Sequence, residues 1–217
     1  MVAGLTGLMF TGSAISAPLF HNKKKHKKIV THQETPLPAK KQDRASQWVD
    51  SVFQSLNQDE RIAQLIMIRA HSNLGQDHIN AVVKDIQENK VGGVIFFQGG
   101  PVRQASLTNY YQSISKVPLL VAIDGEWGLG MRLDSVISLP RNMMIGAIQD
   151  SSLAYDAGRI MGEQCRRMGI HIDFAPDMDV NNNPANPVIN DRSFGENKYQ
   201  VARMGVATIR GMQDDGI

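Results

Sequence analysis

The chain has 217 residues, of which 42% are hydrophobic, so it is long and apolar enough to bury a sizeable core. Its 23 Lys and Arg nearly balance its 21 Asp and Glu, and one basic run at 23–28 carries much of the positive charge, so we expect no nucleic-acid partner. A single cysteine, Cys165, excludes an internal disulfide, and no Cys/His cluster has metal-ligand spacing, so we expect no metal and no cofactor.

The first 44 residues fall into two compositions. Residues 1–17 are apolar and small, and they end like a secretory cleavage site, although the usual basic start is missing. This apolar stretch of about 16 residues is shorter than the roughly 20 of a membrane helix, so we expect no stable membrane span. Residues 18–44 are rich in Lys, His, Pro, Gln and Thr, as is typical of a flexible linker. We therefore predict a signal-like segment, a linker and an exported protein, periplasmic or extracellular.

Residues 45–217 alternate between amphipathic stretches and short apolar runs. A helix is predicted around 48–56, and Asn57 to Glu60 has the pattern of a helix-capping box. Strands are predicted at 65–68, within 90–97, at 119–123, and from 170 with its exit to 180. Helices are predicted between and after them at 77–89, 102–115, 152–168 and 198–213.

Four successive β-α units predict parallel strands joined by right-handed crossovers. The predicted fold class is α/β, with the chain supplying about the first four units of a (β/α)8 TIM-type barrel. The chain stops where a fifth strand is expected, so we expect the carboxyl-terminal half of the barrel to be missing.

The run that ends at Ile123 is followed by an acid, an indole and a guanidinium on a glycine-rich loop. Asp124, Glu126, Trp127 and Arg132 thus follow a buried parallel strand, where α/β folds bind ligands. Such groups suit a polyhydroxylated ligand: a carboxylate accepts hydrogen bonds from hydroxyls, an indole stacks on the ligand, and a guanidinium donates two parallel hydrogen bonds. The alternative is an Asp that caps the next segment, with the Arg as its surface partner.

A second polar cluster follows the fourth predicted strand, at 186–195. Arg192 is either held by the adjacent Asp191 and aimed at a ligand, or part of a salt bridge that braces the loop. His171 is expected to be a hydrogen-bonded core histidine. Three aspartates near this strand are expected to shape turns rather than bind a cation: Asp173, Asp177 and Asp179.

Five ordered segments resemble motifs of glycoside hydrolase family 3, in its β-N-acetylglucosaminidase branch. The segment DGEWGLGMR from Asp124 to Arg132 is similar to the D-Q-E-G-G-x-V-x-R signature and keeps its eight-residue Asp-to-Arg spacing. The other similar segments are ERIAQLIM (60–67), VGGVIF (91–96), DFAPDMDV (173–180) and NDRSFG (190–195). Gly125 and Trp127 depart from the signature, and Trp127 either adds a stacking surface or covers the barrel mouth.

The resemblance implies a retaining enzyme that removes a terminal β-linked sugar from a carbohydrate substrate. It implies that Asp124 accepts hydrogen bonds from sugar hydroxyls, with Arg132 and Arg192 as donors in the same pocket. It also implies that the catalytic residues lie beyond residue 217, so we expect none in this chain and no activity of the chain alone.

The predicted function of the complete enzyme is hydrolysis of terminal β-linked N-acetylglucosamine, for example in peptidoglycan fragments. The alternatives are a β-glucosidase of the same family and a non-catalytic carbohydrate-binding fragment.

Overall fold

We describe the protein from a computed structural model, which defines residues 43–217. The expected signal-like segment, and the expected linker up to residue 42, lie outside the described residues. The first two helices are α1 (Arg44–Ser55) and α2 (Gln58–Ala63). Asp43 caps α1, so the helix starts within the last two residues of the predicted linker. Within the described range, no helix is both long and apolar enough to cross a membrane.

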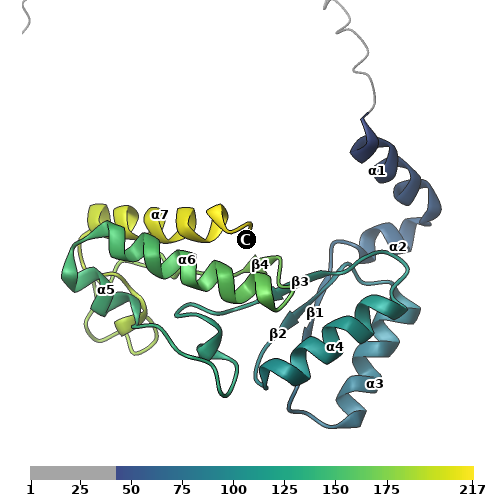
Figure 1. Ribbon diagram of the computed structural model, residues 1–217, viewed down its shortest axis with the longest axis horizontal. Coiled ribbons are helices and arrows are strands. Elements are labelled where there is room, and N and C mark those ends of the chain that lie inside the picture. The colour runs from purple at the N-terminus through teal and green to yellow at the C-terminus, as the bar shows by residue number, and fades with distance from the viewer. Residues whose placement is uncertain (1–42) are drawn as a thin grey trace, which may run out of the picture. The chain divides into compact units, whose positions relative to one another are not determined.

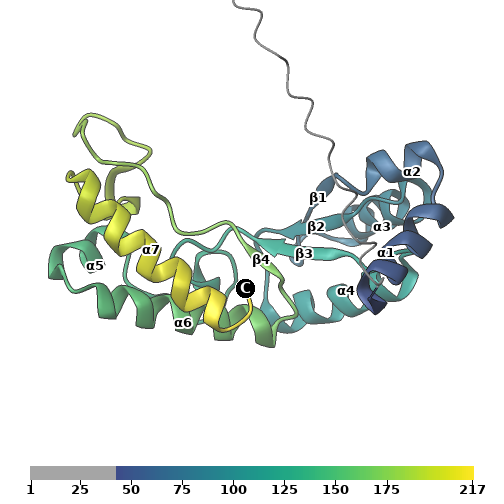
Figure 2. The ribbon, with the colours of Figure 1, turned by 90° about the horizontal axis from the view of Figure 1, so that it is seen from above.

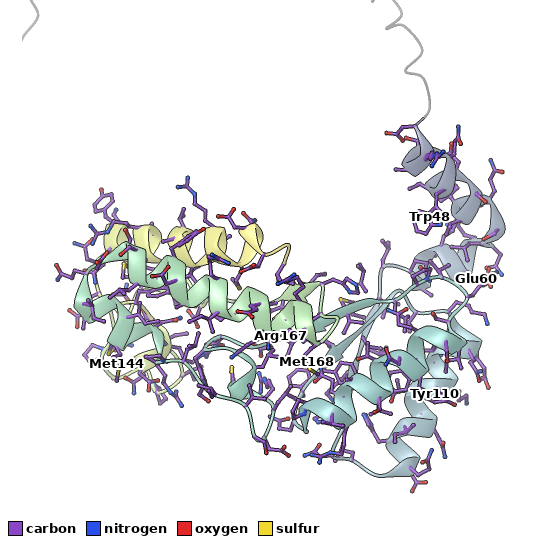
Figure 3. The ribbon with its side chains drawn as sticks, in the orientation of Figure 1. Trp48, Glu60, Tyr110, Met144, Arg167 and Met168 are labelled. Carbon is purple, nitrogen blue, oxygen red and sulfur yellow. The ribbon has the colours of Figure 1, made fainter. Side chains whose placement is uncertain are left out.

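The short helix α2 starts with the predicted capping box. The Asn57 side chain accepts a hydrogen bond from the Glu60 N–H at 2.9 Å, and the Glu60 carboxylate accepts one from the Asn57 N–H at 3.0 Å. The preceding helix, α1, exposes apolar side chains: Trp48, labelled in Figure 3, is 55% exposed. Helical periodicity therefore predicted the helix but not its burial.

Four parallel strands form one sheet in the order β1-β2-β3-β4, so each strand pairs with its neighbour in the chain (Figure 1). The strands are β1 (Met67–Ala70), β2 (Gly93–Phe96), β3 (Leu120–Ile123) and β4 (Ile172–Asp173). In this register Gly93 pairs with both Met67 and Leu120, and Ala122 pairs with Ile172. The carboxyl ends of the strands consequently meet at one edge of the sheet.

Two crossover helices pack against one face of the sheet. They are α3 (Gln76–Lys84), extended by a π-helical turn (Asp85–Asn89), and α4 (Pro101–Ile114). Alternate strand residues such as Val94, Phe96 and Ile123 meet Ile86 and Tyr111 in this core. The intervening residues face the other side of the sheet, as a two-residue side-chain period requires.

The last three helices are α5 (Asn142–Ile148), α6 (Ser151–Arg167) and α7 (Lys198–Asp214). In both views α6 and α7 lie side by side (Figures 1 and 2). A Cβ added to Gly158 would lie 2.1 Å from the Thr208 carbonyl oxygen, and one added to Gly211 would lie 2.2 Å from that of Tyr155. Glycine therefore lets the two backbones approach more closely than any other residue would.

Two strand boundaries and one helix differ from the prediction. The first strand begins at Met67 rather than residue 65, because Leu65 and Ile66 donate hydrogen bonds that continue the α2 turn. The fourth ends at Asp173, since Phe174 makes the last bond to β3 and Pro176 has no N–H to donate. The short helix α5 was not predicted.

Candidate functional site

The loop that follows β3 carries the first predicted pair. The Arg132 Nε donates to the Asp124 carbonyl oxygen at 2.8 Å, and its Nη2 also contacts the Asp124 carboxylate. A 3-10 turn, Leu129–Met131, returns the chain so that residues eight apart meet. The Asp124 side chain is 27% exposed and that of Arg132 14%, so the pair remains accessible at the end of the strand.

A second carboxylate on the same loop is buried against Arg192. The Arg192 guanidinium binds Glu126 in a fork, with Nη2 to Oε1 at 2.6 Å and Nε to Oε2 at 2.9 Å. It also lies 3.2 Å from a carboxylate oxygen of Asp177. The hydrogen bond to Glu126 raises the pKa of Arg192 above its already high ordinary value. The Glu126 side chain is only 4% exposed, against 30% for Arg192, so Glu126 holds the arginine from its buried side.

Of the two alternatives for Arg192, the structure excludes the one in which the adjacent Asp191 holds it. Asp191 instead pairs with Arg141 at 3.0 Å, and Arg141 stacks 4.2 Å above the centre of the Trp127 ring. Trp127 therefore has one face covered by a guanidinium. Arg192 (in the 3-10 turn Asn190–Arg192) is held from a distance in sequence rather than by its neighbour.

Two aromatic rings after β1 and β2 extend the site. The Arg132 guanidinium lies 4.8 Å from the centre of the Phe97 ring, which stacks on the His71 ring at 5.7 Å. Burial is the largest cause that lowers the pKa of His71, which favours its neutral form. No motif singled out Phe97; its position directly after a buried strand was the available signal.

The prediction that His171 lies in the core is wrong. The residue is exposed, although its Nδ1 accepts a hydrogen bond from the Val121 N–H at 3.0 Å. The three aspartates do not act alike either: Asp177 pairs with Arg192 and also accepts a hydrogen bond from the Asp179 N–H at 2.8 Å, whereas Asp173 faces α6. Among the described residues, no group of three or more His, Cys, Asp and Glu could hold a metal ion.

Two carboxylate–guanidinium pairs thus lie at the carboxyl end of β3, and the loop after this strand carries Asp124 and Glu126, the carboxylates of both pairs. A sugar hydroxyl donates one hydrogen and accepts another, so it can bind the carboxylate and the guanidinium of one pair together. Asp124, Arg132 and Arg192, all predicted as substrate-binding residues, are brought to this edge of the sheet. Glu126 and Asp177 join them through ion pairs with Arg192, which were not predicted.

The chain is similar in sequence and fold to known proteins. The chain matches the Glycosyl hydrolase family 3 N terminal domain over residues 57–217. It is 37% identical over 145 residues to "Beta-hexosaminidase A" of Pseudoalteromonas piscicida, covering 61% of this chain and 24% of that protein. It is 25% identical over 183 residues to "Beta-N-acetylglucosaminidase/beta-glucosidase" of Cellulomonas fimi, covering 84% of this chain and 32% of that protein.

Solved structures agree with the predicted fold class. The glycoside hydrolase family 3 β-N-acetylglucosaminidase from Paenibacillus sp. FPU-7 superposes with a TM-score of 0.66 at 40% identity, covering 75% of this chain and 32% of that one. The β-glucoside phosphorylase BglX bound to 2FGlc gives 0.73 at 26% identity, with 79% and 30% covered. These matches confirm an α/β chain with the first units of a TIM-type barrel. This chain belongs to glycosyl hydrolase family 3, through the N-terminal domain of that family.

Proposed function

We propose that this chain forms the sugar-binding part of a glycosidase that removes terminal β-linked N-acetylglucosamine. The observation that carries the proposal is the accessible Asp124–Arg132 pair at the carboxyl end of β3, with Arg192 bound to Glu126 of the same loop. The chain spans 24% and 32% of the two curated relatives named above, so the activity proposed is that of a whole enzyme.

Exposure separates the roles of the two pairs. The Asp124 carboxylate has an accessible edge and accepts hydrogen bonds from sugar hydroxyls, while Arg132 donates beside it. Arg192 offers its Nη1 as a further donor beside its hydrogen bond to the Val188 carbonyl oxygen at 3.2 Å, because Glu126 and Asp177 hold Nε and Nη2. Each guanidinium is therefore fixed before a sugar binds, which lowers the entropy lost on binding.

The described carboxylates suit binding better than bond cleavage. A retaining glycosidase uses two carboxyl groups, or their equivalents, about 5 Å apart across the scissile bond, one of them protonated. Here Asp124, Glu126 and Asp177 each form an ion pair with an arginine and are held by it. We therefore assign none of them as nucleophile or acid.

The names of relatives support N-acetylglucosamine over glucose. The proteins at 37% and 40% identity are named for β-hexosaminidase and β-N-acetylglucosaminidase activity. A β-glucosidase is the second candidate, favoured by the Cellulomonas fimi relative, whose name includes both activities. An exported location is also proposed, supported by the apolar composition of residues 1–17.

The test compares aryl β-N-acetylglucosaminide with aryl β-glucoside, using the protein expressed from its complete gene. We expect release from the first substrate, and a fall of at least about 100-fold in kcat/KM for Asp124→Ala, because a charged hydrogen-bond acceptor for hydroxyls is lost. Asp134→Ala is the matched control, since Asp134 forms an exposed ion pair with Arg103. Release only from the glucoside would favour the second candidate, and unchanged kinetics of Asp124→Ala would contradict the binding role.

A further inference from the structure

Asp173 is a partly buried carboxylate without a cationic partner, and it lies directly behind the sugar-binding loop. In the described residues, no Lys, Arg or His forms an ion pair with it, in contrast to Asp124 and Glu126. It is the last residue of β4, and the register with Ile123 turns its side chain toward the helix layer. There it meets the buried thiol of Cys165 on α6 at 3.8 Å, near the carboxyl end of that helix (Arg167 and Met168 in Figure 3).

The contact that Asp173 makes with the loop is specific. Its Oδ1 accepts a hydrogen bond from the Gly125 N–H at 2.8 Å. Gly125 is the residue between Asp124 and Glu126, and its own carbonyl oxygen accepts a hydrogen bond from the Gly128 N–H at 2.8 Å. The backbone of Gly125 is therefore held at both its donor and its acceptor.

Space around Gly125 is correspondingly small. A Cβ there would lie 3.3 Å from the Asp173 Oδ2 and 3.3 Å from the Gly128 carbonyl oxygen. The side chains on either side of the Gly125 backbone point in different directions: that of Asp124 toward Arg132, and that of Glu126 toward Arg192. A shift of the Gly125 backbone would move both pairs together.

We propose that Asp173 is a positioning residue for the sugar site, which holds the Gly125 N–H from behind and thereby fixes the directions of the Asp124 and Glu126 carboxylates. The proposal rests on the proposed function, because it specifies how the same site is kept in shape. Asp173 acts through the backbone of the loop and does not itself touch the sugar.

The charges around Asp173 agree with this role. The groups that face it are Cys165 from α6, and Asp124 and Glu126 from the loop. Burial, followed by the nearby carboxylates, raises the pKa of Asp173 to about 6, while the Gly125 hydrogen bond opposes this rise. A carboxyl and a carboxylate both accept from an N–H, but the carboxylate does so more strongly. The chemical shift of the Gly125 amide should therefore depend on the protonation of Asp173.

The test uses NMR on the isotope-labelled full chain, with Asp173→Ala, Asp173→Asn and the control Asp156→Ala, which changes an exposed aspartate of α6. In the wild type the Gly125 amide shift should change with pH in one step near pH 6, and the step should vanish in Asp173→Asn. With N-acetylglucosamine as the probe, Asp173→Ala should bind about tenfold more weakly, because the acceptor is lost. Asp173→Asn keeps an oxygen acceptor and should stay within about threefold of the wild type, as should the control.

The outcomes separate this proposal from the proposed function. Equal sugar affinity of Asp173→Ala and the wild type would overturn the positioning role while leaving the sugar site intact. Absence of sugar binding in the wild type would count against the proposed function alone. The positioning role would then be tested by the NMR amide signals of the loop. A pH step at Gly125 that Asp173→Asn abolishes, with displaced Asp124 and Glu126 signals in Asp173→Ala, would support positioning; a flat Gly125 titration would overturn it.

Discussion

The Arg192→Met variant removes the guanidinium that pairs with Glu126 and Asp177, whose side chains are only 4% and 5% exposed. The variant leaves two buried carboxylates without their counter-ion. Breaking a buried ion pair in this way costs about 3–5 kcal/mol. Because the Arg192 side chain is 30% exposed and water can reach part of the site, we expect a smaller cost, about 2–3 kcal/mol of unfolding free energy.

The assay is urea unfolding of the full chain followed by circular dichroism, with the midpoints compared at equal slope m. The matched control is Arg167→Met, which removes an arginine from an exposed pair with Glu163 on α6 and should cost at most about 0.5 kcal/mol. Adding Glu126→Gln to Arg192→Met should recover part of the loss, because one unpaired charge is removed. Equal midpoints for Arg192→Met and Arg167→Met would refute the reasoning.

Three further predictions concern the packing behind the site. Because burial raises the pKa of Asp173 to about 6, the free energy of unfolding should fall as the pH rises from about 4 to 6. Asp173→Asn should therefore be more stable than the wild type by about 1–3 kcal/mol at pH 7.5 and should lose this advantage below pH 4. Equal melting temperatures of the two proteins at both pH values would contradict this prediction. Gly158→Ala should destabilise the chain by about 3 kcal/mol in urea unfolding, because its Cβ would overlap the Thr208 carbonyl, whereas Gly75→Ala, in open space, should change it by less than about 0.5 kcal/mol. Burial raises the pKa of Cys165, which is 0% exposed, so a thiol reagent at pH 8 should label it only after denaturation, and rapid labelling of the native chain would show that the core is open.

The order of the fold could be predicted from local patterns. Apolar runs ending in glycine or a polar residue located all four strands, since parallel strands covered by helices need apolar side chains. The capping box of α2 was predicted because its two hydrogen bonds join residues only three apart. Likewise, Asp124 and Arg132 are eight residues apart within one loop, and the family resemblance implied that both lie in one pocket.

Helix α4 shows where local pattern fails. Its sequence has no apolar stripe, and its buried face includes the polar side chains of Gln104 and Thr108 beside Tyr111. Residues four and seven apart share a helix face, yet nothing in their chemistry indicates that this face meets the sheet. Only packing in the folded chain shows it.

The sequence by itself determined the four β-α units and the strand-end position of Asp124, because each depends on neighbours in the chain. The tertiary structure alone decided that Arg192 pairs with Glu126, 66 residues away, and that Asp191 turns to Arg141 instead. It also placed Asp173 behind Gly125, 48 residues away. Such contacts form only when parallel strands bring their carboxyl ends to one edge, and burial then selects which charges must be paired.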